Sequence, residues 1–303
     1  PELAKWLIQP IIQLNNPTLI YGPGSTGKSW FGQYLAVLAD EGMNSGGLGV
    51  EPSTVLYLDW ETDQDELDSR VTMLRHGLGL EGSSSIWYKH MTSGLASDIE
   101  TIRGLCANHN VQFIVIDSVG SACMGEPESA EVVLRTFGAL RSLGVSSLCI
   151  DHTNKEGSLF GSVYKYNASR QVFECKKDQQ LDDTKIVFGL FHKKANNSRL
   201  MKPIGYELNF SDSAITISRQ DVRDTALETH MRVSDRIQNL LKGKPGGMTV
   251  QDISEELEKT ESHIRKELSD GKKRGTFVVI GNNYANAAFE SEIDGATITQ
   301  WQL

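Results

Sequence analysis

The sequence predicts an α/β protein with a mostly parallel central sheet, followed by a smaller C-terminal domain. Between residues 18 and 219, short β-branched or aromatic runs alternate with helical stretches, which is typical of a sheet flanked by helices. One run, residues 113–116, is apolar without interruption and indicates a central strand covered on both faces. A length of 303 residues suits about two domains of roughly 150 residues each.

The composition is that of an ordinary globular chain. Hydrophobic residues make up 39% and charged residues 23%, which excludes collagen-like, disordered and low-complexity classes. No run of about 18 apolar residues occurs, so no membrane partner is expected; residues 1–14 lack the pattern of a secretory signal, so a cytoplasmic location is expected. The net charge of −9 excludes a uniformly basic nucleic-acid binder but allows a local positive patch. The cysteines lack zinc-site or C-x-x-C spacing and are predicted to be buried thiols: Cys106, Cys123, Cys149 and Cys175.

The first domain is predicted over residues 15–220, after an N-terminal segment, 1–14. Its strands are predicted at 18–21, 54–59, 111–117 and 146–151, with helices at 28–40, 64–76, 97–107 and 130–143 between them. Later runs, at 185–191, 204–210 and 214–218, are separated only by turns and predict antiparallel strands that extend the sheet. Ligands of such sheets bind at the carboxyl ends of the parallel strands.

A linker, residues 221–231, is predicted to lead into a C-terminal domain, 232–303. Its first helix carries Val233 and Ile237 and is stopped by Gly243 and Pro245. A second helix is predicted over 248–257 and a third up to about residue 270, and residues 272–284 are expected to form a strand, a turn and a strand. Three helices followed by a hairpin resemble a winged helix-turn-helix domain.

A phosphate-binding motif, G-x-x-x-x-G-K-[ST], lies between a predicted strand and a predicted helix. It consists of Gly22, Pro23, Gly24, Ser25, Thr26, Gly27, Lys28 and Ser29. Glycines let backbone N–H groups converge on phosphate oxygens, and the start of the helix adds partial positive charge. We expect Lys28 to lie along the β and γ phosphates, Ser29 to ligate Mg²⁺, and Trp30 to border the nucleotide. The motif therefore predicts binding of ATP with Mg²⁺.

Two acidic side chains follow predicted strands at the same edge of the sheet. Asp117 ends an apolar strand, which is the Walker B arrangement, and we expect it to hold Mg²⁺ through water. Glu61 follows the strand 55–59 and is placed to polarise the water that attacks the γ-phosphate. Asp59 is a nearby competitor for that role.

This layout resembles that of RecA-like ATPases, and within them the RepA- and DnaB-type hexameric replicative helicases. The resemblance covers roughly residues 15–210 and is carried by the phosphate-binding loop, the stretch 58–70 with Glu61, residues 114–118 and the stretch that begins Asp151-His152-Thr153. It implies a homo-hexamer that hydrolyses ATP at subunit interfaces, holds single-stranded DNA and works with replication proteins.

In this family the residue matched by His152 senses the γ-phosphate; the alternative is a hydrogen-bonded histidine at a strand end. The loop that follows, residues 155–167, resembles one that grips single-stranded DNA, and Lys155, Lys165, Tyr166 and Arg170 are its candidate contacts. The alternative is that its aromatic side chains pack beneath their own loop.

The resemblance also implies a cation that reaches a neighbouring subunit's nucleotide. Lys194 and Arg199 are the two candidates, because the spacing here departs from the DnaB pattern. Such a residue raises hydrolysis by roughly 10³ to 10⁵. Arg70 matches a family arginine near the adenine, where its plane is suited to stacking on the base.

The C-terminal domain offers a modest basic stretch. Residues 259–274 hold six cations against three acids, and Arg265, Lys266 and Lys273 are candidate DNA contacts. Acidic residues just before this stretch leave protein docking open as the alternative. Two functions therefore remain: a ring-forming, ATP-driven DNA helicase or translocase, and an ATP-gated DNA-binding initiator or regulator that does not unwind DNA. A recombinase is a third, less favoured one.

Overall fold

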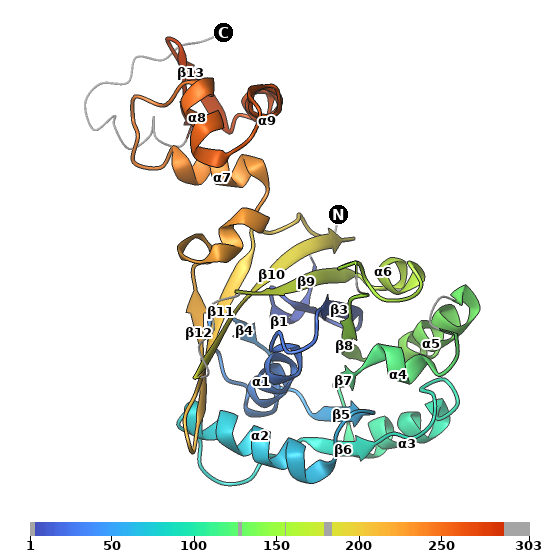
Figure 1. Ribbon diagram of the computed structural model, residues 1–303. Coiled ribbons are helices and arrows are strands. Elements are labelled where there is room, and N and C mark those ends of the chain that lie inside the picture. The colour runs from blue at the N-terminus through green and yellow to red at the C-terminus, as the bar shows by residue number, and fades with distance from the viewer. Residues whose placement is uncertain (1–3, 127–128, 155, 179–183, 288–303) are drawn as a thin grey trace. The chain divides into compact units, whose positions relative to one another are not determined.

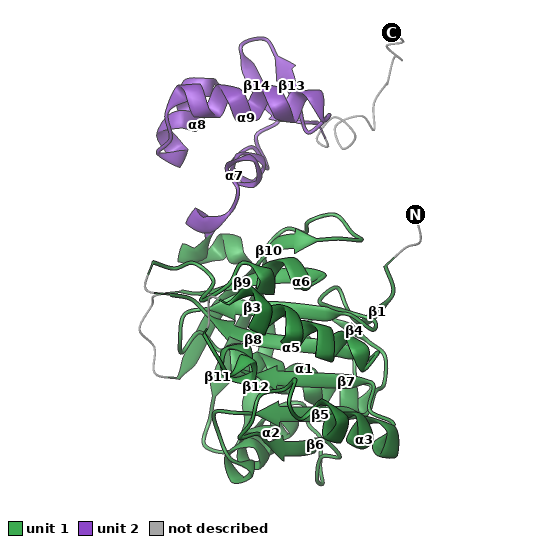
Figure 2. Ribbon diagram, turned by 90° about the vertical axis from the view of Figure 1, so that its right-hand side faces the viewer, with its two compact units in different colours: residues 1–227 green, residues 228–303 purple. Residues whose placement is uncertain are grey.

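The computed structural model describes residues 4–126, 129–154, 156–178 and 184–287. The chain forms two compact units, Pro1–Leu227 and Glu228–Leu303 (Figure 2). No helix among the described residues is long and apolar enough to cross a membrane.

Within the described part of the first unit, nine strands form one mixed sheet (Figure 1). In spatial order they are β12 (Ile215–Gln220), β11 (Ile204–Phe210), β10 (Lys185–Ala195), β9 (Gln171–Lys177), β3 (Pro17–Gly22), β8 (Ser146–His152), β7 (Phe113–Asp117), β5 (Val55–Asp59) and β6 (Trp87–His90). The strands from β9 to β6 run parallel, and β10, β11 and β12 continue the sheet antiparallel. The predicted α/β class with a mostly parallel sheet is confirmed.

Helices cover both faces of this sheet (Figure 1). On one face lie α1 (Lys28–Glu41) and α2 (Gln64–Gly77), packed in a cluster that includes Ile20 and Val115. On the other face lie α3 (Ile99–His109), α4 (Val119–Cys123) and α5 (Ala130–Ser142), packed in a cluster that includes Leu19 and Ile116. Adjacent strand residues thus enter opposite clusters, which explains why the central strands are apolar throughout.

Several elements escaped the sequence reasoning, namely β6, β9, the short helix α6 (Tyr164–Ala168) and a small antiparallel sheet. That sheet joins β1 (Trp6–Gln9), β2 (Ile12–Gln13) and β4 (Gly49–Val50). Ile8, Ile11 and Ile12 are fully buried in the same core as α1. Residues 4–14 are therefore integrated in the first unit. All four cysteines are buried and unbridged, as predicted.

The second unit begins within the 3₁₀ helix η2 (Ala226–His230), which follows η1 (Val222–Asp224). It contains α7 (Val233–Leu240), α8 (Val250–Leu257), α9 (Glu261–Lys273) and an antiparallel hairpin of β13 (Phe277–Ile280) and β14 (Asn283–Asn286). Thr249 and Asp252 form a capping box at the start of α8. A Cβ at Gly271 would lie 2.2 Å from the Phe277 ring, so glycine lets the hairpin pack closely on α9. The order of three helices and a hairpin is the predicted one.

Candidate nucleotide-binding site

The phosphate-binding loop connects β3 to α1 at the carboxyl edge of the sheet. A Cβ at Gly22 would lie 2.3 Å from the Cys175 carbonyl oxygen, so the loop must start with glycine. Gly27 caps α1 with a φ of 87°, in the left-handed region that favours glycine. No side chain caps this end and no acidic residue lies in the first turn. The amides of that turn therefore remain available to an anion.

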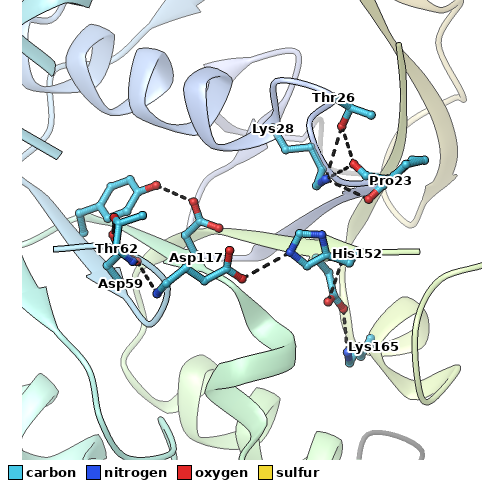
Figure 3. Close-up of polar contacts among 12 residues, drawn as sticks. Pro23, Thr26, Lys28, Asp59, Thr62, Asp117, His152 and Lys165 are labelled. Atoms are coloured by element: carbon cyan, nitrogen blue, oxygen red, sulfur yellow. Dashed lines mark hydrogen bonds and ion pairs between the residues drawn. The ribbon is translucent and has the colours of Figure 1, made fainter. Parts of the chain in front are cut away.

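Lys28 is buried at the centre of this loop (Figure 3). Its ammonium group donates hydrogen bonds to the carbonyls of Gly22 at 2.9 Å and Pro23 at 2.6 Å, and lies 3.4 Å from the Thr26 hydroxyl. Burial lowers the pKa of Lys28, and the nearby acidic groups oppose this. Phosphate oxygens would offer the ammonium group charged acceptors in place of neutral carbonyls.

Asp117 lies at the end of β7 with its carboxylate buried. Its Oδ2 accepts a hydrogen bond of 2.9 Å from the Tyr57 hydroxyl, whereas no donor within the described residues satisfies Oδ1. Burial raises the pKa of Asp117 to about 6, and the hydroxyls of Ser29 and Tyr57 act in the opposite direction. A buried carboxylate with a free oxygen is a site that a cation would stabilise.

These residues fit a magnesium ion held with its nucleotide. Mg²⁺ is usually bound through one or two carboxylates together with phosphates and waters, not by an all-protein cage. The described residues contain no group of three or more acidic, histidine or cysteine side chains arranged for a metal. Ser29, which lies close to the Asp117 carboxyl, and the free Oδ1 of Asp117 are the groups that would hold the ion.

Asp59 and Glu61 have different surroundings at the end of β5. Asp59 is buried, and its Oδ1 accepts hydrogen bonds from the amides of Glu61 at 2.8 Å and Thr62 at 3.0 Å. Its Oδ2 accepts one from the Thr62 hydroxyl (Figure 3). Asp59 is thus occupied in forming the turn that leads to α2, and Glu61 presents the more exposed carboxylate.

Glu61 contacts His152, from the end of β8. The two side chains are each about two-fifths exposed, and His152 Nε2 lies 3.4 Å from Glu61 Oε1. The hydrogen bond with His152 is the main cause that lowers the pKa of Glu61 to about 2, and Ser118 and Lys28 contribute in the same direction. The Glu61 carboxylate is therefore ionised at physiological pH. It lies beside His152, after which the loop that follows β8 begins.

Arg70 makes a planar contact, but with a protein side chain. Its guanidinium carbon lies 4.8 Å from the centre of the Trp30 ring, and it pairs with Glu66 one turn away on α2. Trp30 in turn packs edge-on against Phe210. This cluster borders Ser29 at the start of α1, and contact with an adenine stays a prediction for both Trp30 and Arg70.

The candidate DNA contacts after β8 need correction. Lys165 is completely buried, with its ammonium group 2.7 Å from Asp151 Oδ2, so it cannot reach a DNA strand in this conformation. Tyr166 packs against the core and donates its hydroxyl to the Lys193 carbonyl at 2.8 Å. Arg170 is exposed, and Lys155 lies outside the described residues.

Lys194 also needs correction. Its ammonium group donates to three carbonyls at the end of α6, those of Tyr166 at 2.9 Å, Asn167 at 2.9 Å and Ser169 at 2.8 Å. Three donors are all that an ammonium group has, so Lys194 serves its own subunit. Arg199 lies exposed in the segment after β10 and stays a candidate for a role between subunits.

The candidate DNA contacts in the second unit are exposed on α9, but two of them pair within that helix. Arg265 lies 2.8 Å from Glu261, and Lys273 lies 3.8 Å from Asp270. Lys266 is also exposed. Such exposed pairs are weak, so they reduce but do not remove the positive charge of the helix.

Two residues at this site escaped the sequence reasoning. Tyr57 orients Asp117, but a tyrosine inside a central strand is indistinguishable from a core residue in sequence. Asp151 precedes His152 in the stretch that begins Asp151-His152-Thr153, but no sequence pattern predicts that it pairs with the buried Lys165.

Comparison with known proteins gives the family and the fold of this chain. The sequence model of a protein family described as an AAA domain (AAA_25) matches residues 1–158, just over half of the chain. The chain belongs to this AAA domain family. The matched part includes the phosphate-binding loop, Glu61, Asp117 and His152, and ends before Lys165, Lys194, Arg199 and the second unit.

A solved structure with a similar fold is that of the KaiC-like protein PH0186 from the hyperthermophilic archaeon Pyrococcus horikoshii OT3. The two chains are 16% identical with a TM-score of 0.52, and the alignment covers 72% of this chain and 99% of that one. At this identity the likeness concerns the fold. No curated protein matches the sequence. Family membership and fold together identify a RecA-like P-loop ATPase.

Proposed function

We propose that this AAA domain protein is an ATP-dependent, ring-forming DNA helicase or translocase of the RepA-like replicative type. It hydrolyses ATP at subunit interfaces and grips single-stranded DNA. The observation that carries the proposal is the contact between Glu61 and His152. It joins a carboxylate suited to water activation to the strand end from which the candidate DNA loop emerges.

In hydrolysis, Glu61 acts on the attacking water and Lys28 on the phosphates. The Glu61 carboxylate is ionised and orients the attacking water, and it receives the proton of that water as the new bond to the γ-phosphorus forms. The bond from that phosphorus to the β–γ bridging oxygen breaks, and ADP leaves with the electron pair. Lys28 balances the charge on the β and γ phosphates. Magnesium, when bound by Ser29 and Asp117, neutralises further phosphate charge.

Assembly completes the site in this proposal. Lys194 is occupied within its own subunit, so Arg199 is the cation that we assign to the neighbour's γ-phosphate. A cation supplied in this way makes hydrolysis depend on assembly, by roughly 10³ to 10⁵ in rate. A homo-hexamer is the ring that the resemblance favours.

We assign the DNA grip to the loop between β8 and α6 together with the first residue of that helix. Phe160 is 41% and Tyr164 is 40% exposed, and both are suited to stacking on bases, which is worth about 1–3 kcal/mol per base. Arg170 supplies exposed positive charge nearby in the chain. The second unit is assigned as a winged helix that docks on DNA or on a replication protein.

The test compares ATP hydrolysis with and without a single-stranded oligonucleotide, together with unwinding of a forked duplex. We expect the oligonucleotide to stimulate hydrolysis in the wild type. We expect that stimulation to fall at least tenfold in the double variant Phe160→Ala, Tyr164→Ala. Trp87→Ala is the matched control, because it removes another aromatic side chain that is 44% exposed, on β6. Native mass measurement with an ATP analogue tests the hexamer.

The alternative function gives a different outcome. An ATP-gated initiator or regulator would bind a duplex tightly and sequence-specifically in a gel-shift experiment without separating the strands. That result, or hydrolysis indifferent to single-stranded DNA, would overturn the helicase proposal.

A further inference from the structure

A closed ring of hydrogen bonds joins His152 to the exposed aromatic residue Phe160. The His152 carbonyl accepts from the Phe160 amide at 3.0 Å, and the Phe160 carbonyl accepts from the Lys165 ammonium group at 3.1 Å. Lys165 also donates to Asp151 Oδ2 at 2.7 Å. Asp151 Oδ1 then accepts from the His152 amide at 2.9 Å, which closes the ring.

The charged half of this ring is shut off from water. The side chains of Lys165 and Asp151 are 0% and 1% exposed. Burial raises the pKa of Asp151, and the Lys165 ammonium group opposes that rise. Removing one partner from a buried pair leaves an uncompensated charge and strongly destabilises the folded state. The ring is therefore costly to open, and its members are expected to move together.

The two ends of the ring face different surroundings. On one side, His152 Nε2 lies 3.4 Å from the Glu61 carboxylate, at the nucleotide-binding edge. On the other side, Phe160 is 41% exposed, and its ring lies 5.7 Å from the Lys165 ammonium group. The loop between them is itself organised, because Asn154 Oδ1 accepts from the amides of Glu156 and Ser158.

We propose that Lys165 and Asp151 are positioning residues that make His152 and the loop of residues 156–163 respond as one unit to the nucleotide. The inference rests on the proposed function, because it takes His152 as the residue that senses the γ-phosphate. Lys165 thus acts from within the protein, holding the loop to β8, and not as a DNA contact. Energetic coupling between two sites is carried by hydrogen-bonded and ion-paired networks of this kind.

Hydrogen exchange measured by mass spectrometry on the full chain tests this inference. Exchange is followed in peptides covering residues 22–29 and 156–163, with and without Mg²⁺ and a non-hydrolysable ATP analogue. In the wild type we expect the analogue to protect residues 22–29 and to change exchange in 156–163 at least threefold. The double variant Asp151→Asn, Lys165→Met removes both charges and keeps an acceptor for the His152 amide. It is expected to retain the first response and to lose the second.

Two further variants keep the test decisive. Arg75→Met is the matched control, because Arg75, in the last turn of α2, is another buried cation of the first unit and pairs with Glu41. Both responses should persist in this variant. Asp151→Asn with Lys165→Gln replaces the ion pair by a neutral pair that keeps polar groups on both sides; it is expected to reduce the loop response only partly and covers the case in which the first double variant does not fold.

The outcomes separate the two levels of the proposal. A loop response of wild-type size in the folded double variant would overturn the positioning role. So would a wild-type loop that ignores the analogue while residues 22–29 are protected. Absence of protection at 22–29 in the folded wild type would instead count against the proposed function and would remove the basis of the inference with it.

Discussion

The buried carboxylate of Asp117 should destabilise the protein in the absence of nucleotide, and Asp117→Asn should therefore raise its stability. Burial raises the pKa of Asp117 from 3.8 to about 6. At 1.36 kcal/mol for each pKa unit, holding the charged form in the folded state costs about 3 kcal/mol once it is fully ionised. Asparagine keeps an oxygen for the Tyr57 hydroxyl and carries no charge.

The cost of the buried Asp117 charge should depend on pH. Below pH of about 4 the carboxyl is protonated in both the folded and the unfolded chain, so the cost is absent. It grows as the pH rises from about 4 to 6 and is complete above that. The free energy of unfolding of Asp117→Asn minus that of the wild type should therefore increase by up to about 3 kcal/mol between pH 4 and 8, since the other groups titrate alike in both proteins.

Denaturant unfolding at pH 4, 6 and 8, without nucleotide or Mg²⁺, measures this difference. A difference that is independent of pH, or a wild type that is the more stable protein at pH 8, would show that the ionised Asp117 carboxylate does not destabilise the folded state. Asp59→Asn is the control, because asparagine keeps one oxygen for the two backbone amides but loses the acceptor of the Thr62 hydroxyl, which should destabilise the protein by about 1 kcal/mol. With Mg²⁺ and ATP at 100 times the dissociation constant, the wild type should gain about 2.7 kcal/mol and Asp117→Asn much less.

Three further substitutions probe separate parts of the account. Gly22→Ala would place its Cβ 2.3 Å from the Cys175 carbonyl oxygen, so the loop must shift; calorimetry should show ATP affinity reduced at least tenfold while the protein stays folded. Lys194→Met removes the donor to three helix-end carbonyls and should lower the free energy of unfolding by about 1–3 kcal/mol; an unchanged value would show that these bonds contribute nothing. Thr249→Ala breaks the capping box with Asp252 and should cost the second unit about 1 kcal/mol, measured by its thermal unfolding, without changing ATP affinity in the first.

The sequence was sufficient for the parts of the site whose positions follow from local pattern. The phosphate-binding loop is contiguous. Asp117 and His152 end parallel strands and Glu61 lies just after one, so their common edge could be predicted from the strand pattern alone. The competition between Asp59 and Glu61 could not be decided there, because it depends on which carboxylate the turn occupies.

Long side chains near the site were the least predictable. A lysine in a loop with aromatic neighbours is typical of a nucleic-acid contact, yet Lys165 pairs with Asp151, fourteen positions earlier in the chain, and is buried. Lys194 likewise meets the end of α6 only through the pairing of β10 with β9. The burial of such residues depends on tertiary contacts, and these leave no periodic pattern in the sequence.

Some elements of the fold were missed for a similar reason. Strand β6 has only four residues, and β1 and β2 are separated by the Pro10 turn, so none of them shows a clear alternation. Their positions are fixed by neighbours: β6 pairs with β5, and the β1–β2 hairpin buries Ile8 and Ile12 against the core of α1.

Single-turnover hydrolysis of bound ATP by Glu61→Gln shows whether Glu61 activates the attacking water. Glutamine keeps the size of the side chain but cannot accept the proton of the attacking water. The variant should bind ATP and Mg²⁺ with wild-type affinity and hydrolyse it about 10² to 10⁴ times more slowly. Hydrolysis at the wild-type rate by this variant would contradict the assignment of Glu61 as the residue that activates water.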